Sequence, residues 1–332
     1  MNFFFVMQNL YPVWGGAEKS ADTLIKLLTS NGHTVKWMCE SNKEEIEPEL
    51  SHLMKDVDII VTQLLWTPVA TTLAEKYNKK CVVFMRSYEN ICRIVHSDPQ
   101  FHAECGQQCS GCKHKISGYE VQGLALRKAD LIIANSRWMQ LFLHERHQVH
   151  SKVVYPFINF EDYQIKPESP KYIAMNQMSY AKGADIFLQI AQHMPKEKFK
   201  LAGNQGWMPP VDVPPNVELH KFQSPQELYG DVWLWLNPAR WEEPFGRTVI
   251  EAQLAQIPVL TSDYSTIKLD KKLHPSGGLI VKDLTNIKEW KTKILKIKKD
   301  HQNYINKTAQ SNLKAFSSEV NTEKFLRLME EL

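Results

Sequence analysis

The sequence predicts an α/β protein built from two doubly wound, parallel-sheet domains. The chain has 332 residues, which is about twice the usual size of one domain. Short apolar runs rich in β-branched residues alternate with amphipathic helical patterns, and this alternation is typical of parallel sheets. A polar segment with two prolines, residues 161–170, separates the alternation into two series. These three observations carry the prediction.

The first series begins with an apolar strand over residues 3–7, a turn at Gly15-Gly16 and an amphipathic helix over residues 17–30. Asn31-Gly32 is a typical helix end. Further strands are expected at residues 57–61, 81–85 and 131–134. We assign residues 1–160 to this Rossmann-like domain, with a cysteine-containing insertion over residues 87–117.

The second series predicts strands at residues 172–174, 199–202, 217–219, 232–236, 259–260 and 279–281. Residues 170–310 are therefore expected to form a second Rossmann-like domain. Residues 287–332 have a helical pattern, and we expect residues 311–332 to pack back on the first domain. Six lysines lie early in this region: Lys288, Lys291, Lys293, Lys296, Lys298 and Lys299. They suit either an anionic membrane surface or, since Glu289 and Asp300 dilute them, an ordinary solvated helix face.

Composition excludes several function classes. The chain has 40 Lys and Arg against 37 Asp and Glu, and 43% of its residues are hydrophobic, as in an ordinary globular protein. This balance argues against a disordered chain and against nucleic acid as a partner. The apolar run at residues 3–7 is too short to span a membrane, and no basic residue precedes it as in a signal peptide. We therefore expect a cytoplasmic protein whose six cysteines stay reduced. Neither a Gly-x-Gly-x-x-Gly fingerprint nor a P-loop is present.

The most informative segment runs from Arg240 to Glu251. Glu243 stands eight positions before Glu251, and a Pro-Phe-Gly turn lies between them. If a helix begins near Gly246, the free N–H groups of its first turn form an anion site, to which Arg247 adds positive charge. A helix terminus between two carboxylates suits a diphosphate with a polyhydroxylated group at either end.

This segment resembles the group 1 family of retaining glycosyltransferases with the GT-B fold. The family pattern is a Glu, seven residues and a Glu around a Phe-Gly turn, which Glu243 to Glu251 matches in full. Two further family elements are similar to Gly15-Gly16-Ala17-Glu18 and to Lys182-Gly183. The end of the family's nucleotide-binding domain is similar to Pro258-Val259-Leu260 and residues 277–281. The resemblance covers nearly the whole chain and implies two domains with the donor between them.

The resemblance also implies the role of each residue. Glu243 would hold hydroxyls of the donor sugar, and Glu251 the ribose hydroxyls of the nucleotide. Lys182, next to Gly183, would bind the diphosphate and stabilise it as it leaves. The backbone amides of Phe245, Gly246, Arg247 and Thr248 would also bind the diphosphate. Gly16 would let the first loop approach it closely.

The implied reaction is transfer of a sugar, with retention, to a carbohydrate or lipid-linked acceptor in glycan or polysaccharide synthesis. The donor phosphate itself would take the acceptor's proton, so no dedicated side-chain base is needed. No cofactor is expected. A UDP-sugar is the commonest donor in the family, and a GDP-sugar remains open. Asp56-x-Asp58 is similar to the metal-binding motif of another glycosyltransferase fold, but it leads directly into a strand. We therefore predict no catalytic metal.

Two positions depart from the family pattern. Gln177 stands where relatives usually carry a diphosphate-binding Arg, so either Arg247 or Arg240 compensates or donor binding is weaker. The second reading is a non-catalytic nucleotide-sugar-binding relative or subunit. Relatives often carry a His near the end of the strand that residues 81–85 represent, and the nearest equivalent here is Arg86. The acceptor-side candidates are therefore Arg86, Tyr88 and Glu89.

The cysteines allow two interpretations. Cys92, Cys105, Cys109 and Cys112 lie in the insertion, and Cys109-x-x-Cys112 has the spacing of structural zinc sites. Free thiols are equally consistent, since a second such pair is missing. Cys39 and Cys81 lie in apolar runs and are expected to be small buried hydrophobes.

Overall fold

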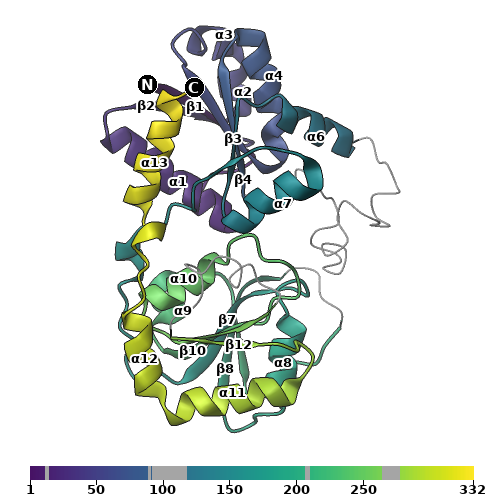
Figure 1. Cartoon of the computed structure of the whole chain (residues 1–332), viewed down its shortest axis with the longest axis vertical. Coiled ribbons are helices and arrows are strands. Elements are labelled where there is room, and N and C mark those ends of the chain that lie inside the picture. Colours follow the sequence, from purple (N-terminus) through teal and green to yellow (C-terminus); the bar gives the residue numbers. More distant parts are fainter. Residues whose placement is uncertain (12–14, 89–90, 92–117, 206–209, 264–276) are drawn as a thin grey trace. The chain divides into compact units, whose positions relative to one another are not determined.

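The computed structural model describes residues 1–11, 15–88, 91, 118–205, 210–263 and 277–332. They form two compact units (Figure 1). Among the described residues, unit 1 holds the chain up to Asn159 together with Lys314–Leu332, and unit 2 holds Phe160–Leu313. Glu89, Cys92, Cys105, Cys109 and Cys112 lie outside the described residues, so the predicted zinc site does too.

Unit 1 is built on a six-stranded parallel sheet with the order β2-β1-β3-β4-β5-β6. Its strands are β1 (Asn2–Val6), β2 (Thr34–Met38), β3 (Ile59–Gln63), β4 (Lys80–Met85), β5 (Leu131–Ala134) and β6 (Lys152–Val153). Its helices are α1 (Gly15–Ser30), α2 (Lys43–Ile46), α3 (Leu50–Leu53), α4 (Thr67–Tyr77), α6 (Gly118–Arg127), α7 (Arg137–His147) and α13 (Ser318–Glu330).

The helix α13 completes the core of unit 1, although it follows unit 2 in the sequence. Its Phe325 is fully buried and stacks on Phe84, with ring centroids 5.6 Å apart, and contacts Phe3 at 5.9 Å. The Ser318 N–H donates to the Ile158 carbonyl at 2.9 Å where the segment enters the unit. Figure 1 shows α13 in yellow beside the purple α1, which it contacts.

Unit 2 is built on a second six-stranded parallel sheet, with the order β12-β11-β10-β7-β8-β9. Its strands are β7 (Tyr172–Met178), β8 (Lys198–Gln205), β9 (Val217–His220), β10 (Val232–Asn237), β11 (Val259–Ser262) and β12 (Leu279–Val281). Its helices are α8 (Ala184–Gln192), α9 (Pro225–Tyr229), α10 (Arg247–Leu254), α11 (Ile287–Lys299) and α12 (His301–Ala309). The predicted doubly wound α/β architecture is confirmed in both units.

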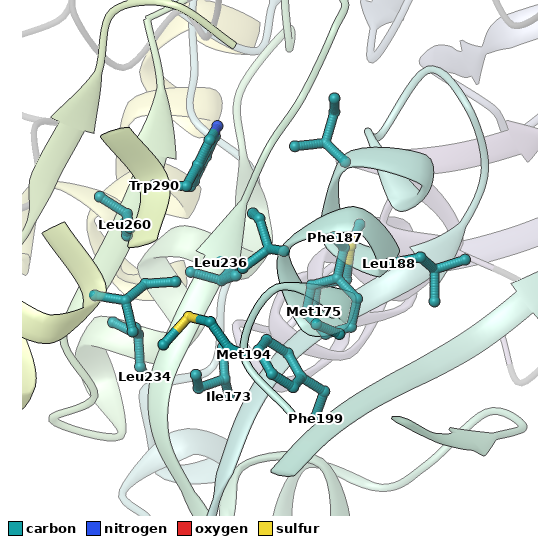
Figure 2. Close-up of a cluster of buried hydrophobic side chains, with 14 of the residues drawn as sticks. Ile173, Met175, Phe187, Leu188, Met194, Phe199, Leu234, Leu236, Leu260 and Trp290 are labelled. Carbon is teal, nitrogen blue, oxygen red and sulfur yellow. The ribbon is translucent and has the colours of Figure 1, made fainter. Parts of the chain in front are cut away.

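The core of unit 2 lies between its sheet and helices α8 and α11. Figure 2 shows Ile173, Leu234 and Leu236 of the central strands, with Phe187 and Trp290 from the two helices. Trp290 has no exposed surface, and its indole N–H donates to the Leu284 carbonyl at 2.9 Å. Because the central strands are buried, they carry near-continuous apolar runs, which is why the sequence pattern found them.

The strand order fixes where a ligand can bind. In unit 2 the chain builds β7, β8 and β9 outward in one direction and then returns to place β10 on the other side of β7. Loops that leave neighbouring strands in opposite directions diverge, so ligands in such sheets bind at this switch point, beyond the carboxyl ends of the strands. The loops after β7 and β10 are those that carry Lys182 and Glu243.

Across the described part of the chain, we find no helix that combines the length and the apolar character needed to cross a bilayer.

Truncation of Phe325 tests the contribution of α13. We expect Phe325→Ala to lower the free energy of unfolding by about 3–5 kcal/mol, because it opens a cavity among buried aromatic rings. Arg327→Ala on the same helix is the control, since the Arg327 side chain is 76% exposed. Urea denaturation measures both variants. Equal stability of the two would show that α13 is peripheral to the core.

Candidate functional site

The candidate site lies at the carboxyl edge of the unit 2 sheet, where two loops and one helix terminus meet. Lys182 lies in the loop between β7 and α8, and Glu243 lies between β10 and α10. The Lys182 ammonium forms an ion pair with Glu243 Oε2, and the Trp241 indole N–H donates to the same oxygen at 2.9 Å. The ammonium also lies 4.6 Å from the centroid of the Trp241 ring. The lysine and glutamate predicted from separate motifs therefore meet in one pair.

Burial of this pair is partial. The Lys182 side chain is 22% exposed and that of Glu243 is 11% exposed. Partial removal from water strengthens the electrostatic field of the lysine compared with a surface residue, while some of its surface remains accessible.

Gly183 allows the two loops to approach. Its backbone is left-handed, with φ of 77°, and a Cβ at this position would overlap the Pro238 carbonyl oxygen. The Arg240 N–H donates to the Ala181 carbonyl at 3.0 Å and joins the loops directly. Only glycine fits both the backbone conformation and the close contact.

Arg240 holds the base of the site. Its Nε donates to Asp185 Oδ1 at 3.1 Å, and a terminal nitrogen donates to Asp185 Oδ2, which makes a bidentate pair. The guanidinium also lies 4.4 Å from the centroid of the Tyr180 ring. Arg240 therefore braces the loop against α8.

The helix α10 begins where the sequence predicted it. Gly246 is its N-cap, with φ of 80°, and Arg247 is its first residue. Phe245 is buried beneath this turn. The Val249 N–H donates to the Gly246 carbonyl at 3.0 Å, and the helix dipole adds partial positive charge at this end. The terminus has the chemistry of an anion site.

Glu251 lies two turns into α10 and is almost sealed from solvent, with 6% exposure. Its Oε1 accepts from the Tyr163 hydroxyl at 2.8 Å and from Arg247 Nε at 2.6 Å, and its Oε2 accepts from the Tyr229 hydroxyl at 2.9 Å. Burial, and then the Glu251 charge, raise the pKa of both tyrosines, so both hydroxyls remain protonated donors. The structure thus pairs Arg247 with Glu251.

Gln177 lies at the end of β7 with an exposed side chain and a left-handed backbone, φ of 75°. The pairing of β7 with β8 shifts register at this residue. A non-glycine residue in this conformation is strained, and such strain is concentrated at functional sites. Gln177, which stands where relatives usually carry an Arg, thus lies at an irregular strand end.

The candidates of unit 1 fall in different environments. Gly16 lies in the first turn of α1. Arg86 follows β4, is 8% exposed, and donates from Nε to Gln63 Oε1 at 3.2 Å. Tyr88 is wholly buried, and its hydroxyl accepts from the Trp138 indole N–H at 2.8 Å. Both side chains are thus largely buried, and Arg86 is the one that keeps some exposed surface.

No group of three metal-ligating side chains occurs among the residues that the structure describes. Asp58 Oδ2 accepts from the Asn2 N–H at 2.7 Å, which fits its interpretation as a residue at the start of a strand. Cys39 and Cys81 are buried free thiols, as expected. Burial raises the pKa of Cys81 to about 12, so this thiol stays protonated and unreactive at neutral pH.

Sequence reasoning missed Tyr163, Tyr229 and Trp241. Trp241 lies two positions before Glu243, so its place next to the motif could have marked it as a site residue. The two tyrosines come from η4 (Phe160–Tyr163) and α9, in segments with no motif of their own. Their role depends on tertiary contacts that spacing does not reveal.

Substitution of Gly183 tests the close contact of the loops. We expect Gly183→Ala to destabilise the protein by clearly more than the roughly 1–2 kcal/mol that a left-handed backbone alone costs an alanine. Gly32→Ala is the matched control, because Gly32 has φ of 80° and open space where a Cβ would lie. Chemical denaturation gives both values. If the two variants lose the same stability, the contact with Pro238 is not restrictive.

Comparison with known proteins finds a family similarity in the segment that holds this site. Residues 157–312 match the family model described as "Glycosyl transferases group 1". An uncharacterized 42.6 kDa protein in the cps region of Klebsiella pneumoniae is 22% identical, over 79% of this chain and 85% of that one.

Two solved structures are similar over essentially both whole chains. Anabaena HepE in complex with UDP-glucose has a TM-score of 0.74 and 17% identity, covering 100% of each chain. Sucrose-phosphate synthase from Thermosynechococcus elongatus has a TM-score of 0.74 and 14% identity, covering 99% of this chain and 98% of that one. These likenesses show the fold, and the family model covers the unit that holds the Glu243–Glu251 segment. The chain therefore has the GT-B fold, and its residues 157–312 are similar to the group 1 glycosyltransferases.

Proposed function

We propose that this protein transfers a sugar from a nucleoside diphosphate sugar, with retention of the anomeric configuration, to a carbohydrate or lipid-linked acceptor. The observation that carries the proposal is the Lys182–Glu243 pair beside the terminus of α10, at the switch point of the unit 2 sheet. A cation, a sugar-binding carboxylate and a helix N-terminus are the groups that a diphosphate sugar requires.

A UDP-sugar is the proposed donor. Anabaena HepE was solved in complex with UDP and with UDP-glucose, which supports the uridine nucleotide over the guanosine alternative. The similarity to a cps-region protein supports a role in polysaccharide synthesis. In this assignment Glu243 holds hydroxyls of the donor sugar and Glu251 faces the ribose.

In this proposal Lys182 is the main residue that stabilises the negative charge of the leaving group. As the bond between the anomeric carbon and the phosphate oxygen breaks, negative charge grows on the departing diphosphate. Lys182 and the first-turn N–H groups of α10, among them those of Arg247 and Thr248, are placed to stabilise that charge. Because they stabilise the transition state more than the intact donor, they accelerate the step rather than merely bind substrate.

The donor phosphate itself serves as the base in this proposal. Its departing oxygen takes the acceptor's hydroxyl proton on the same face of the sugar, which gives retention and needs no side-chain base. Lys182 and the helix terminus supply the positive charge that a metal ion supplies in other transferases, so we propose a metal-independent reaction without a cofactor. Arg86 is the proposed acceptor-side residue of unit 1.

A second candidate function is that of a nucleotide-sugar-binding subunit without turnover. Gln177 favours it, because an amide can hydrogen-bond phosphate but adds no charge. Arg240 and Arg247 are engaged with Asp185 and Glu251, so their bonding does not favour compensation for the missing arginine. The intact Lys182–Glu243 pair favours the enzyme.

We further propose that the protein works in the cytoplasm and contacts membranes peripherally. Helix α11 exposes Lys288, Lys296 and Lys299 on the side opposite to its buried Trp290 and Ile294. Such lysines attract anionic lipid headgroups by about 1 kcal/mol each.

Release of nucleoside diphosphate from a panel of nucleotide sugars tests the enzymatic proposal. With chelator present, we expect the wild type to release one nucleotide. Lys182→Ala should reduce the rate by about 100-fold or more, the usual effect of removing one group that stabilises developing negative charge. Glu243→Ala should abolish release by loosening the sugar. Lys196→Ala, at an exposed lysine outside the site, should leave the rate unchanged.

Two other outcomes would change the conclusion. Loss of release on chelation would contradict metal independence. Tight binding without release, even with candidate acceptors added, would establish the binding subunit, and Gln177→Arg would then be the variant with which to seek turnover.

A further inference from the structure

The carboxylate of Glu251 is already occupied within unit 2. Its two oxygens accept three hydrogen bonds, from Tyr163, Tyr229 and Arg247. A carboxylate offers about four lone-pair positions in all. The side chain is also almost sealed from solvent, so water does not compete for the remaining position.

A ribose would exceed this capacity. The inference rests on the proposed function, in which the ribose 2′- and 3′-hydroxyls donate to Glu251. Two new donors added to the three present would require more acceptor positions than the carboxylate has. One of the present donors must therefore leave when the nucleotide binds.

Arg247 and Tyr229 are firmly held. Arg247 lies one turn before Glu251 on the same helix, and its bond at 2.6 Å joins two opposite charges in a buried place, where the loss of either partner is most costly. Tyr229 has no exposed surface and packs against Trp235, with ring centroids 5.0 Å apart. Displacing either one would disrupt the helix or the core.

Tyr163 is held differently. It is the last residue of η4, a four-residue 3₁₀ turn at which the chain enters unit 2. Short 3₁₀ turns have weaker hydrogen-bond geometry than α-helices. The segment that follows, up to Pro170, is polar, and five of its residues are exposed: Gln164, Lys166, Glu168, Ser169 and Pro170. The Tyr163 ring is itself buried and lies 6.1 Å from that of Tyr229. Of the three donors, however, it is the one that belongs to a short turn next to an exposed segment, and we therefore expect it to be the one that moves.

We propose that the Tyr163 hydroxyl occupies on Glu251 the place of a ribose hydroxyl, and that a bound nucleotide displaces it together with the η4 turn. Tyr163 is in this sense a specificity-determining residue, because it sets the cost that a ribose must overcome. The turn that connects unit 1 to unit 2 thereby responds to the nucleotide.

Calorimetric binding of UDP and 2′,3′-dideoxy-UDP tests this proposal. Tyr163→Phe keeps the ring and removes only the competing hydroxyl. We expect it to bind UDP about three- to tenfold more tightly than the wild type, the factor that corresponds to one net hydrogen bond. Its affinity for the dideoxy nucleotide should stay unchanged. Tyr229→Phe is the matched control and should not gain affinity, because Tyr229 has no exposed surface and the phenylalanine ring would still cover the Glu251 oxygen that the hydroxyl leaves.

Suppose that the wild type prefers UDP to the dideoxy nucleotide and that Glu251→Gln loses this preference. Unchanged or weaker UDP binding by Tyr163→Phe would then overturn the proposal. If the wild type and Glu251→Gln both bind the two nucleotides equally, Glu251 does not bind ribose, and the assignment of Glu251 under the proposed function fails as well. The two failures are thus distinguishable.

Amide hydrogen exchange of the wild type provides a second measurement that needs no variant. UDP should speed exchange in peptides that cover residues 160–165, and 2′,3′-dideoxy-UDP should not. Slower or unchanged exchange with saturating UDP would contradict displacement of the turn.

Discussion

The contact of Gly183 with the Pro238 carbonyl is the constraint on which the site depends. Two loops leave neighbouring strands in opposite directions, and they meet because Gly183 has no side chain. The Ala181–Arg240 backbone bond and the Asp185–Arg240 pair then hold the loops together. Lys182 and Glu243, which come from different strands, are thereby brought into one ion pair. The chemistry of the site follows from a backbone contact rather than from the charged residues themselves.

The two glutamates of the motif show how environment divides their roles. Glu243 pairs with the ammonium of Lys182, whose side chain is 22% exposed, and accepts a second hydrogen bond from Trp241. Glu251 is surrounded by two tyrosines and an arginine, and it serves as an internal acceptor for donors from three elements. The two side chains are almost equally buried, at 11% and 9% exposure, so they differ in their hydrogen-bond partners rather than in accessibility.

Sequence reasoning reached the fold because buried parallel strands leave apolar runs that are visible without a structure. It missed β2, in which Thr34, Lys36 and Trp37 are all exposed, and β6, which has only two residues. The Glu243–Glu251 spacing located the site since it is local. The Tyr163–Glu251 bond joins residues 88 positions apart, and Tyr88 turned out to lie in the core. Such contacts depend on packing, which a single sequence does not encode in any local pattern.

The place of α13 has a consequence for synthesis on the ribosome. Phe325 fills the core of unit 1 among Phe3 and Phe84, yet it is translated only after all of unit 2. The described part of unit 2 from Phe160 to Leu313 contains its whole sheet and can collapse as soon as it emerges. Domains usually fold in order from the amino terminus, but here unit 2 can complete its fold before unit 1 does. Nascent unit 1 must keep an apolar surface uncovered until its last helix arrives, which makes that intermediate a natural client for chaperones.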